Sequence, residues 1–141
     1  MLDALKLSLN ATAVFGFVIY IVVATLLFAL FQFVYTRMTP HKEFELIRSN
    51  NPAAAIALGG SLIGFALPAS NIISFSAGLL DVVVWVLIAA VVQLLAFIAT
   101  SLVVRGLSVR IAKGELAAAI YAASVAVSVG LLNAACMTPS A

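Results

Sequence analysis

Residues 7–36 read "LSLNATAVFGFVIYIVVATLLFALFQFVYT", a stretch of the chain without Lys, Arg, Asp or Glu. Three more such stretches follow, at residues 49–80, 82–104 and 116–141. A helix needs about 20 consecutive apolar residues to cross a bilayer, so each stretch is long enough for one crossing. We therefore predict four transmembrane segments, near residues 13–35, 52–70, 81–103 and 115–135.

The composition excludes an ordinary soluble fold. Of the 141 residues, 65% are hydrophobic and 9% are charged, whereas a soluble domain carries about 25% charged residues. Spanning segments must pair their backbone polar groups internally, as helices or as strands of a closed barrel, and the polar–apolar alternation of barrel strands is absent here. We expect an all-α membrane protein with one transmembrane domain over residues 1–141, embedded in a lipid bilayer.

Lys and Arg gather in two of the loops between the predicted spans. Loop 36–50 and loop 104–114 together hold Arg37, Lys42, Arg48, Arg105, Arg110 and Lys113. The opposite side holds only Lys6, because loop 71–80 carries no charge. Since Lys and Arg accumulate in cytoplasmic loops, we expect both basic loops in the cytoplasm and both termini in the periplasm.

A shift of 64 residues aligns the chain with itself. It brings "IRSNNPAAAI" (47–56) onto "IAKGELAAAI" (111–120). We interpret this match as an internal duplication, with repeat one at about 13–70 and repeat two at about 77–135; the alternative is chance similarity between apolar segments of low complexity. Each repeat crosses the membrane twice, so the four helices form two helical hairpins of the same orientation, a parallel repeat.

The second and fourth spans are rich in small residues. The candidate helix-packing residues are Gly59, Gly60, Gly64 and Gly130. Helices associate in membranes where small residues let their backbones approach. We therefore expect the second and fourth helices at the centre, the first and third outside them or facing other subunits, and a homo-oligomer.

The candidate polar residues within the predicted spans are Gln32, Ser61, Gln93, Ser124 and Ser128. Gln93 lies nearest the middle of its span. One interpretation is a hydrated path or a solute site. The other is an interhelical hydrogen bond, worth about 0.6 kcal/mol.

The loop "TPHKEFELIRSNNP" (39–52) predicts a short helix, followed by the start of the second transmembrane helix. Thr39 would cap the short helix, with Pro40 at its first position. The side chains of His41 and Glu43 would be in water. Asn51 would cap the second transmembrane helix.

The single cysteine, Cys136, follows the predicted C-terminal end of the fourth helix. A reactive thiol needs a nearby cation or a helix N-terminus, and the sequence provides neither. We expect Cys136 to pack at the helix end; a disulfide between two chains is the second possibility, and catalysis the third. Asn133 would satisfy free carbonyls at that end. One His and one Cys on opposite sides predict no metal site, and we expect no cofactor.

Two motifs resemble the YjfL family of small bacterial inner-membrane proteins, a domain of unknown function with four predicted spans. The first is the Thr-Pro-x-x-Glu element at Thr39, Pro40 and Glu43, and the second is "GLLNAACMT" (130–138), with Asn133 and Cys136. The first dozen residues and the tail "PSA" depart from the family pattern. The resemblance implies a location in the bacterial inner membrane and no established activity.

These patterns favour a non-enzymatic, multi-pass and oligomeric inner-membrane protein. Its role would be to support envelope integrity, or to recruit a cytoplasmic or membrane protein partner through the two basic loops. The alternative is a small oligomeric channel or transporter with a path past Gln93. We expect no nucleic-acid partner.

Overall fold

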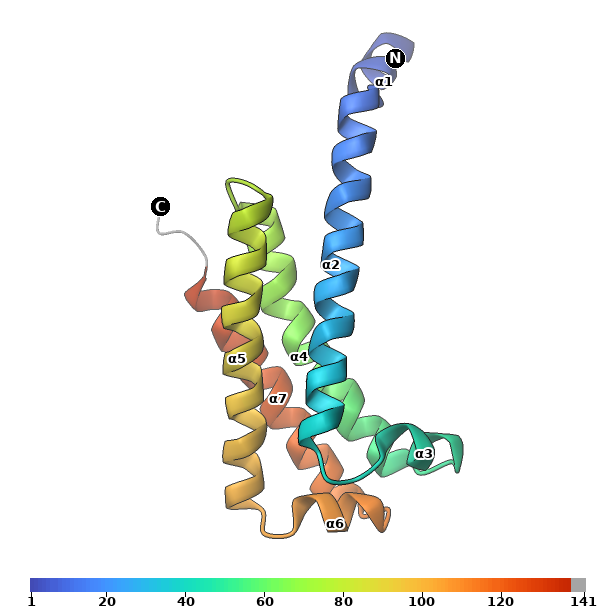
Figure 1. Ribbon diagram of the computed structural model, residues 1–141, viewed down its shortest axis with the longest axis vertical. Coiled ribbons are helices and arrows are strands. Elements are labelled where there is room, and N and C mark those ends of the chain that lie inside the picture. The colour runs from blue at the N-terminus through green and yellow to red at the C-terminus, as the bar shows by residue number, and fades with distance from the viewer. Residues whose placement is uncertain (138–141) are drawn as a thin grey trace.

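The computed structural model describes residues 1–137 and places seven α-helices in them (Figure 1). Their bounds are α1 Leu2–Ser8, α2 Ala11–Met38, α3 Glu43–Arg48, α4 Pro52–Phe75, α5 Leu79–Val103, α6 Leu107–Ala112 and α7 Leu116–Cys136. The helices α2, α4, α5 and α7 are long and apolar enough to cross a membrane, which confirms the four predicted spans. Thr138 of the C-terminal motif and the tail "PSA" lie outside the described residues.

The short helices α3 and α6 lie at one end of the bundle (Figure 1). The N-terminus and the turn between α4 and α5 lie at the other end, toward which α7 also runs. The two loops that carry most of the cations are therefore at the same end of the molecule, as the loop pattern predicted.

The helix α2 is the most exposed of the four long helices. Its 28 residues extend about 42 Å at 1.5 Å per residue, against a hydrocarbon thickness of about 30 Å. Its N-terminal end projects beyond the turn between α4 and α5 (Figure 1). Aromatic contacts hold the C-terminal half: the rings of Phe31 and Phe65 stack with centroids 4.2 Å apart, and Tyr35 meets Phe97 edge-on at 5.2 Å.

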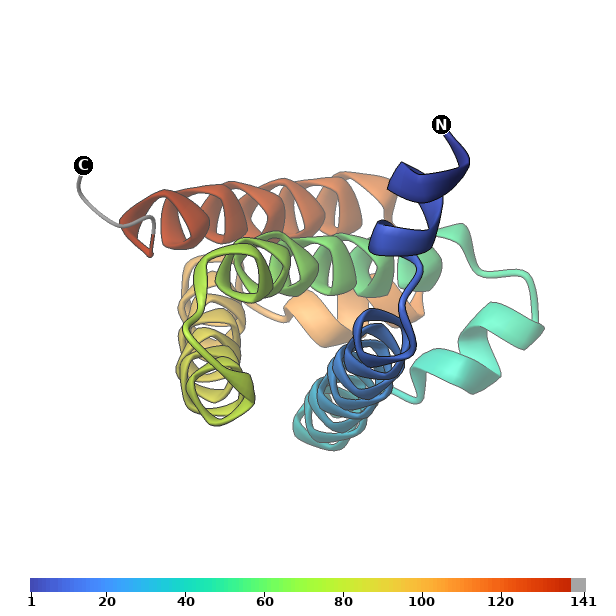
Figure 2. The same ribbon diagram turned by 90° about the horizontal axis from the view of Figure 1, so that it is seen from above.

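The helices α4 and α7 lie side by side in the most extensive helix contact of the bundle, with α4 between α7 on one side and α2 and α5 on the other (Figure 2). A Cβ atom built on Gly60 would lie 2.4 Å from the Cβ of Ala123, and one built on Gly130 would lie 2.1 Å from the carbonyl oxygen of Gly64. The two backbones approach this closely because these positions have no side chain. The predicted close packing of the second and fourth spans is confirmed, but only α4 is central: α7 lies at the edge of the bundle (Figure 2), and Gly59 faces open space.

Two asparagines join α4 to the second half of the chain near both of its ends. Asn51 accepts a hydrogen bond from the backbone N–H of Ala54, so it caps α4 as predicted. The same side chain donates to the carbonyls of Ile111 and Ala112, each at 3.2 Å. Near the other end of α4, the amide of Asn71 donates to the carbonyl of Ala134 at 2.6 Å.

The offset of 64 residues recurs in the structure. Both bounds of α6 lie 64 residues after those of α3, and α7 begins 64 residues after α4. A residue with positive φ precedes the N-caps of α4 and α7: Asn50 at 65° before α4 and Gly114 at 83° before α7. These correspondences fit the predicted duplication, which stays a prediction.

Replacing Gly130 by Ala should destabilise the bundle by about 1–3 kcal/mol, because the new methyl group overlaps the carbonyl of Gly64. The control is Gly59→Ala, whose methyl group meets nothing within 4 Å. Thermal unfolding of both variants in detergent measures the difference. Equal melting temperatures for the two variants would contradict the close approach of α4 and α7.

Candidate functional site

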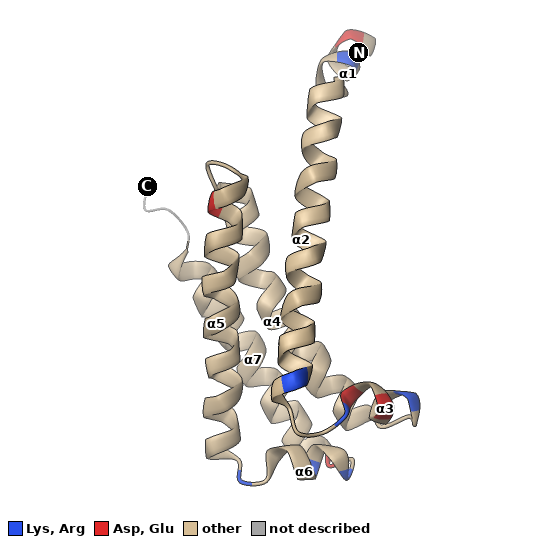
Figure 3. Ribbon diagram, in the orientation of Figure 1, with Lys and Arg blue, Asp and Glu red and all other residues tan. Residues whose placement is uncertain are grey.

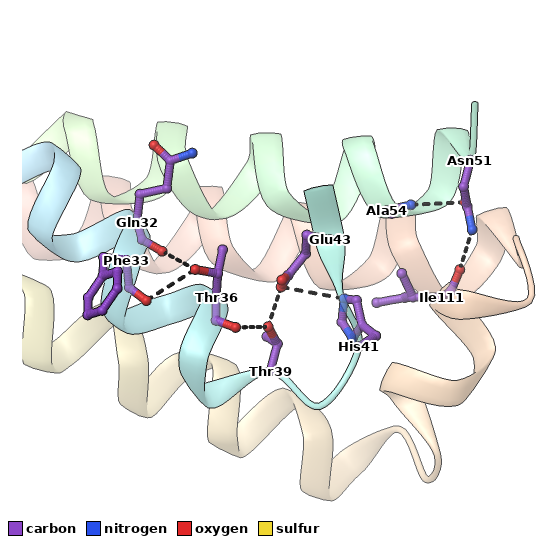
Figure 4. A network of polar contacts seen from close by, with 9 residues as sticks. All are labelled: Gln32, Phe33, Thr36, Thr39, His41, Glu43, Asn51, Ala54 and Ile111. Carbon is purple, nitrogen blue, oxygen red and sulfur yellow. Dashed lines mark hydrogen bonds and ion pairs between the residues drawn. The ribbon is translucent and has the colours of Figure 1, made fainter. Parts of the chain in front are cut away.

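A cluster of polar side chains lies where the chain turns from α2 into α3 (Figure 4). The helix α2 ends at Met38 because Pro40 disfavours the helical conformation at Thr39, which is extended at φ −77° and ψ 130°. The hydroxyl of Thr39 then lies against both the carbonyl of Thr36 and the carboxyl of Glu43. The structure corrects two predictions here: Thr39 does not cap the short helix, and α3 begins at Glu43 rather than at Pro40.

Glu43 is the most buried ionisable side chain of this turn. It is 2% exposed, and one carboxyl oxygen accepts a hydrogen bond from the hydroxyl of Thr39. Nε2 of His41 lies 3.5 Å from the same oxygen, and the His41 side chain is 5% exposed. The predictions that Glu43 and His41 are in water are therefore wrong, because the turn folds both side chains inward against the helix ends.

Burial sets the charge of this pair. It raises the pKa of Glu43 above its ordinary value of 4.5, an effect that the hydrogen bond from Thr39 opposes. It lowers the pKa of His41 below its ordinary value of 6.5. Both shifts favour the neutral forms, because charge is costly to bury. Nδ1 of His41 is also buried, without a hydrogen-bond partner among the described residues.

Tyr35 extends the cluster toward the centre of the bundle. Its ring is 3% exposed, and its hydroxyl is hydrogen-bonded to Ser61 of α4 and lies within electrostatic reach of Glu43. Sequence reasoning missed Tyr35. The signal was its position one helical turn before Thr39, which places both residues on one face of α2.

Gln93 points inward from α5 and is 2% exposed. Its amide donates to the carbonyl of Ala126 on α7 at 3.0 Å, and a Cβ atom on Gly64 would lie 2.4 Å from the same nitrogen. Oε1 of Gln93 is buried without a hydrogen-bond partner among the described residues. Gln93 therefore ties three helices together where α4 and α7 are closest.

The other polar candidates do not join Gln93 in one path. Gln32 is half-buried on α2, where its backbone carbonyl accepts from the hydroxyl of Thr36. Ser124 and Ser128 are exposed on α7, and each donates to the carbonyl four residues earlier. Such bonds within a helix satisfy the hydroxyl locally. Of the predicted set, only Ser61 and Gln93 are buried.

The C-terminal motif also differs from its prediction. Asn133 is 8% exposed, and its Nδ2 has no hydrogen-bond partner among the described residues. Contrary to the prediction, the side chain therefore does not donate to free carbonyls at the helix end. Cys136 is exposed rather than packed. It borders a cavity of about 330 Å³ together with Asp81 and Trp85 of α5. Residues 1–137 contain no group of three or more His, Cys, Asp or Glu able to hold a metal ion.

Charged side chains are confined to the ends of the helices (Figure 3). Within the described residues, Lys42 pairs with Glu45 at 3.2 Å and Arg110 pairs with Glu115. Both pairs lie at the end formed by α3 and α6. The exposed cations Arg37, Arg48, Arg105 and Lys113 make this end strongly basic.

A family model described as Domain of Unknown Function (DUF350) matches residues 8–137. The chain is 36% identical over 123 residues to the protein named "UPF0719 inner membrane protein YjfL" of Escherichia coli strain K12, and equally to its namesake in Escherichia coli O157:H7. Each match covers 87% of this chain and 93% of the relative. No solved structure matches the chain.

Replacing Glu43 by Gln should reduce the loss of stability with rising pH. The folded protein holds the proton of Glu43 more tightly than the unfolded chain, since burial raises its pKa. Stability therefore falls as pH rises from 4.5 through the folded pKa, and Gln has no proton to lose. Thermal unfolding in detergent, at pH steps from 4.5 upward, measures the two profiles.

The matched control is Glu45→Gln, because the Glu45 side chain is exposed to water. Its profile should follow the wild type. His41 contributes in the opposite direction, since its lowered pKa costs stability as pH falls, but it is present in all three proteins. A Glu43→Gln profile parallel to the wild type would contradict the burial of a proton at this site.

Proposed function

The chain belongs to the DUF350 family, described as a Domain of Unknown Function. We propose that it is a non-enzymatic, multi-pass protein of the bacterial inner membrane that acts as an oligomer. In this role the assembled bundles support the integrity of the cell envelope. The basic end of each bundle, formed by α3 and α6, binds anionic lipid headgroups at the cytoplasmic surface. An acidic cytoplasmic or membrane protein is the other partner that suits this end.

The observation that carries the proposal is the concentration of charge at one end of an otherwise apolar bundle (Figure 3). Six of the seven Lys and Arg side chains belong to the loops around α3 and α6. Such an imbalance favours a cytoplasmic location for this end. Each cation near an anionic membrane surface contributes about 1 kcal/mol of attraction.

The use of the buried polar groups supports a structural role. Gln93, Asn51 and Asn71 all donate to backbone carbonyls of another helix, so they hold helices together. The alternative, a channel or transporter past Gln93, has weaker support, because Ser124 and Ser128 are exposed on α7 instead of lining a path with Gln93. Enzymatic action through Cys136 is likewise not favoured, because no Lys, Arg or His of residues 1–137 lines its cavity.

The proposed orientation predicts which thiols react from outside the cell. An impermeant maleimide should label the native Cys136 in intact spheroplasts, because this thiol is exposed at the end opposite α3 and α6. The matched control carries Cys136→Ser and Ser49→Cys, which moves the one thiol to the exposed loop before α4. It should react only after the membrane is permeabilised. Labelling of the control alone in intact spheroplasts would show that the orientation is the opposite of the proposed one.

Removing two exposed cations should weaken the binding of anionic lipid. The variant Arg105→Gln with Lys113→Gln should lower the affinity for phosphatidylglycerol by on the order of thirtyfold, at about 1 kcal/mol for each cation. Native mass spectrometry in detergent reports both the retained lipids and the number of subunits. The control Lys6→Gln lies at the opposite end and should bind as the wild type does. Monomers alone, with lipid retention equal in all three proteins, would refute the proposed function.

A further inference from the structure

An apolar groove of about 200 Å³ lies between α2 and α5. The side chains that line it are all Leu, Val, Phe or Ala. Phe31 and Phe65 form its inner wall, at 2% and 1% exposed, and Leu30 and Val91 form its rim, at 47% and 55% exposed. An apolar cavity of about 150 Å³ stays dry and binds hydrocarbon molecules such as benzene. A groove of this size and lining therefore suits a hydrocarbon chain.

Arg37 lies at the end of this groove toward α3 and α6. Leu30 and Val34 line the groove, and Arg37 follows them on the same face of α2, because residues spaced by three or four share a face of a helix. Arg37 is exposed in the last turn of α2 (Figure 3). Its guanidinium carbon lies 4.8 Å from the centre of the Phe33 ring, and this contact keeps the cation against the outer surface of α2.

The charges around the groove favour an anion at this end alone. None of the ion pairs among residues 1–137 involves Arg37, or Arg105, which follows α5 at the same end. The other end of the groove differs, because the first turn of α5 carries Asp81 and residues 7–36 of the chain carry no charge. A ligand with an apolar chain and one anionic group would therefore place that group at Arg37.

The groove lies at the depth of an acyl chain whose headgroup meets Arg37. Along α2 it extends from Leu27 to Val34. At 1.5 Å per residue, these positions lie about 15 Å and about 5 Å from Arg37 along the helix axis. One leaflet contributes about 15 Å, half of the hydrocarbon thickness of a bilayer. The groove therefore lies within the leaflet whose headgroups are at the basic end.

We propose that this groove binds one acyl chain of an anionic phospholipid of the cytoplasmic leaflet, and that the phosphate of this lipid contacts Arg37. The acyl chain packs on Phe31 and Phe65 and occupies the space between α2 and α5. This inference rests on the proposed binding of anionic lipid by the basic end, and it names one site for that lipid. Phosphatidylglycerol has both required parts, an apolar chain and an anionic headgroup.

The test measures binding of the first lipid molecule to the full chain by native mass spectrometry in detergent. The probes are phosphatidylglycerol and phosphatidylethanolamine with the same acyl chains. Arg37→Gln should lower the affinity for phosphatidylglycerol about fivefold, because a cation near an anionic headgroup contributes about 1 kcal/mol. Phosphatidylethanolamine, whose headgroup has no net charge, should bind to this variant as it binds to the wild type.

Filling the groove should affect both lipids. Ala90 is half-buried and lines the groove, so Ala90→Phe should lower the affinity for both lipids severalfold. The matched control is Ala99→Phe, at an exposed position of α5 that does not line the groove, and it should bind both lipids as the wild type does. Val91→Phe, at the exposed rim, repeats the test without entering the interior of the bundle.

Combining the variants tests whether Arg37 and the groove hold the same lipid molecule. In the Ala90→Phe protein, Arg37→Gln should have no further effect, because two changes that act on one bound molecule are not additive. Arg48→Gln removes a cation of α3 outside the groove, so its effect should be equal with and without Ala90→Phe.

Additive effects of Arg37→Gln and Ala90→Phe would overturn the groove site and leave the proposed lipid binding by the basic end standing. Equal binding of phosphatidylglycerol by the wild type and by every variant that removes a cation of the basic end would overturn both.

Discussion

The close approach of α4 and α7 is the contact on which the rest of the bundle depends. Lipid tails are as apolar as leucine, so burying apolar side chains does not drive helices together in a membrane. Contact between backbones does, and Gly60, Gly64 and Gly130 allow it. Pro68, buried within α4, has no N–H to donate to the carbonyl of Gly64, and this carbonyl lies against Gly130. The carbonyl of Gly64, which lacks this hydrogen bond within α4, therefore lies where the backbone of α7 is closest.

The buried polar groups fall into two sets with different surroundings. Gln93, Asn51 and Asn71 reach backbone carbonyls across helix contacts, and this use stabilises the arrangement of α4, α5, α6 and α7. Glu43 and His41 are ionisable, and they are buried where the chain leaves the membrane-spanning part. Burial favours their neutral forms, so this turn tolerates ionisable groups only because they can give up their charges.

The sequence predicted the four spans and the two basic loops because both depend on composition over long stretches. It predicted the capping role of Asn51 because that motif is local. It did not predict the burial of Glu43, which depends on a hydrogen bond from the hydroxyl of Thr39 at the end of α2. Nor did it separate Gly60 from Gly59, one residue away, because only the position of α7 decides which glycine is covered.

The two halves share a pattern but not an environment, and this difference has a physical cause. The helix α5 packs against both α4 and α7, whereas α2 is held mainly through Phe31 and Tyr35 and leaves its N-terminal half exposed. In the predicted duplication the two units have one inner junction and two outer ends, so equivalent residues differ in burial. Gly60 is covered while Ser124 is exposed for this reason. Small residues such as Ser124 on α7 then lie where a further repeat would pack. In a membrane, the exposed length of α2 contacts lipid or a neighbouring copy.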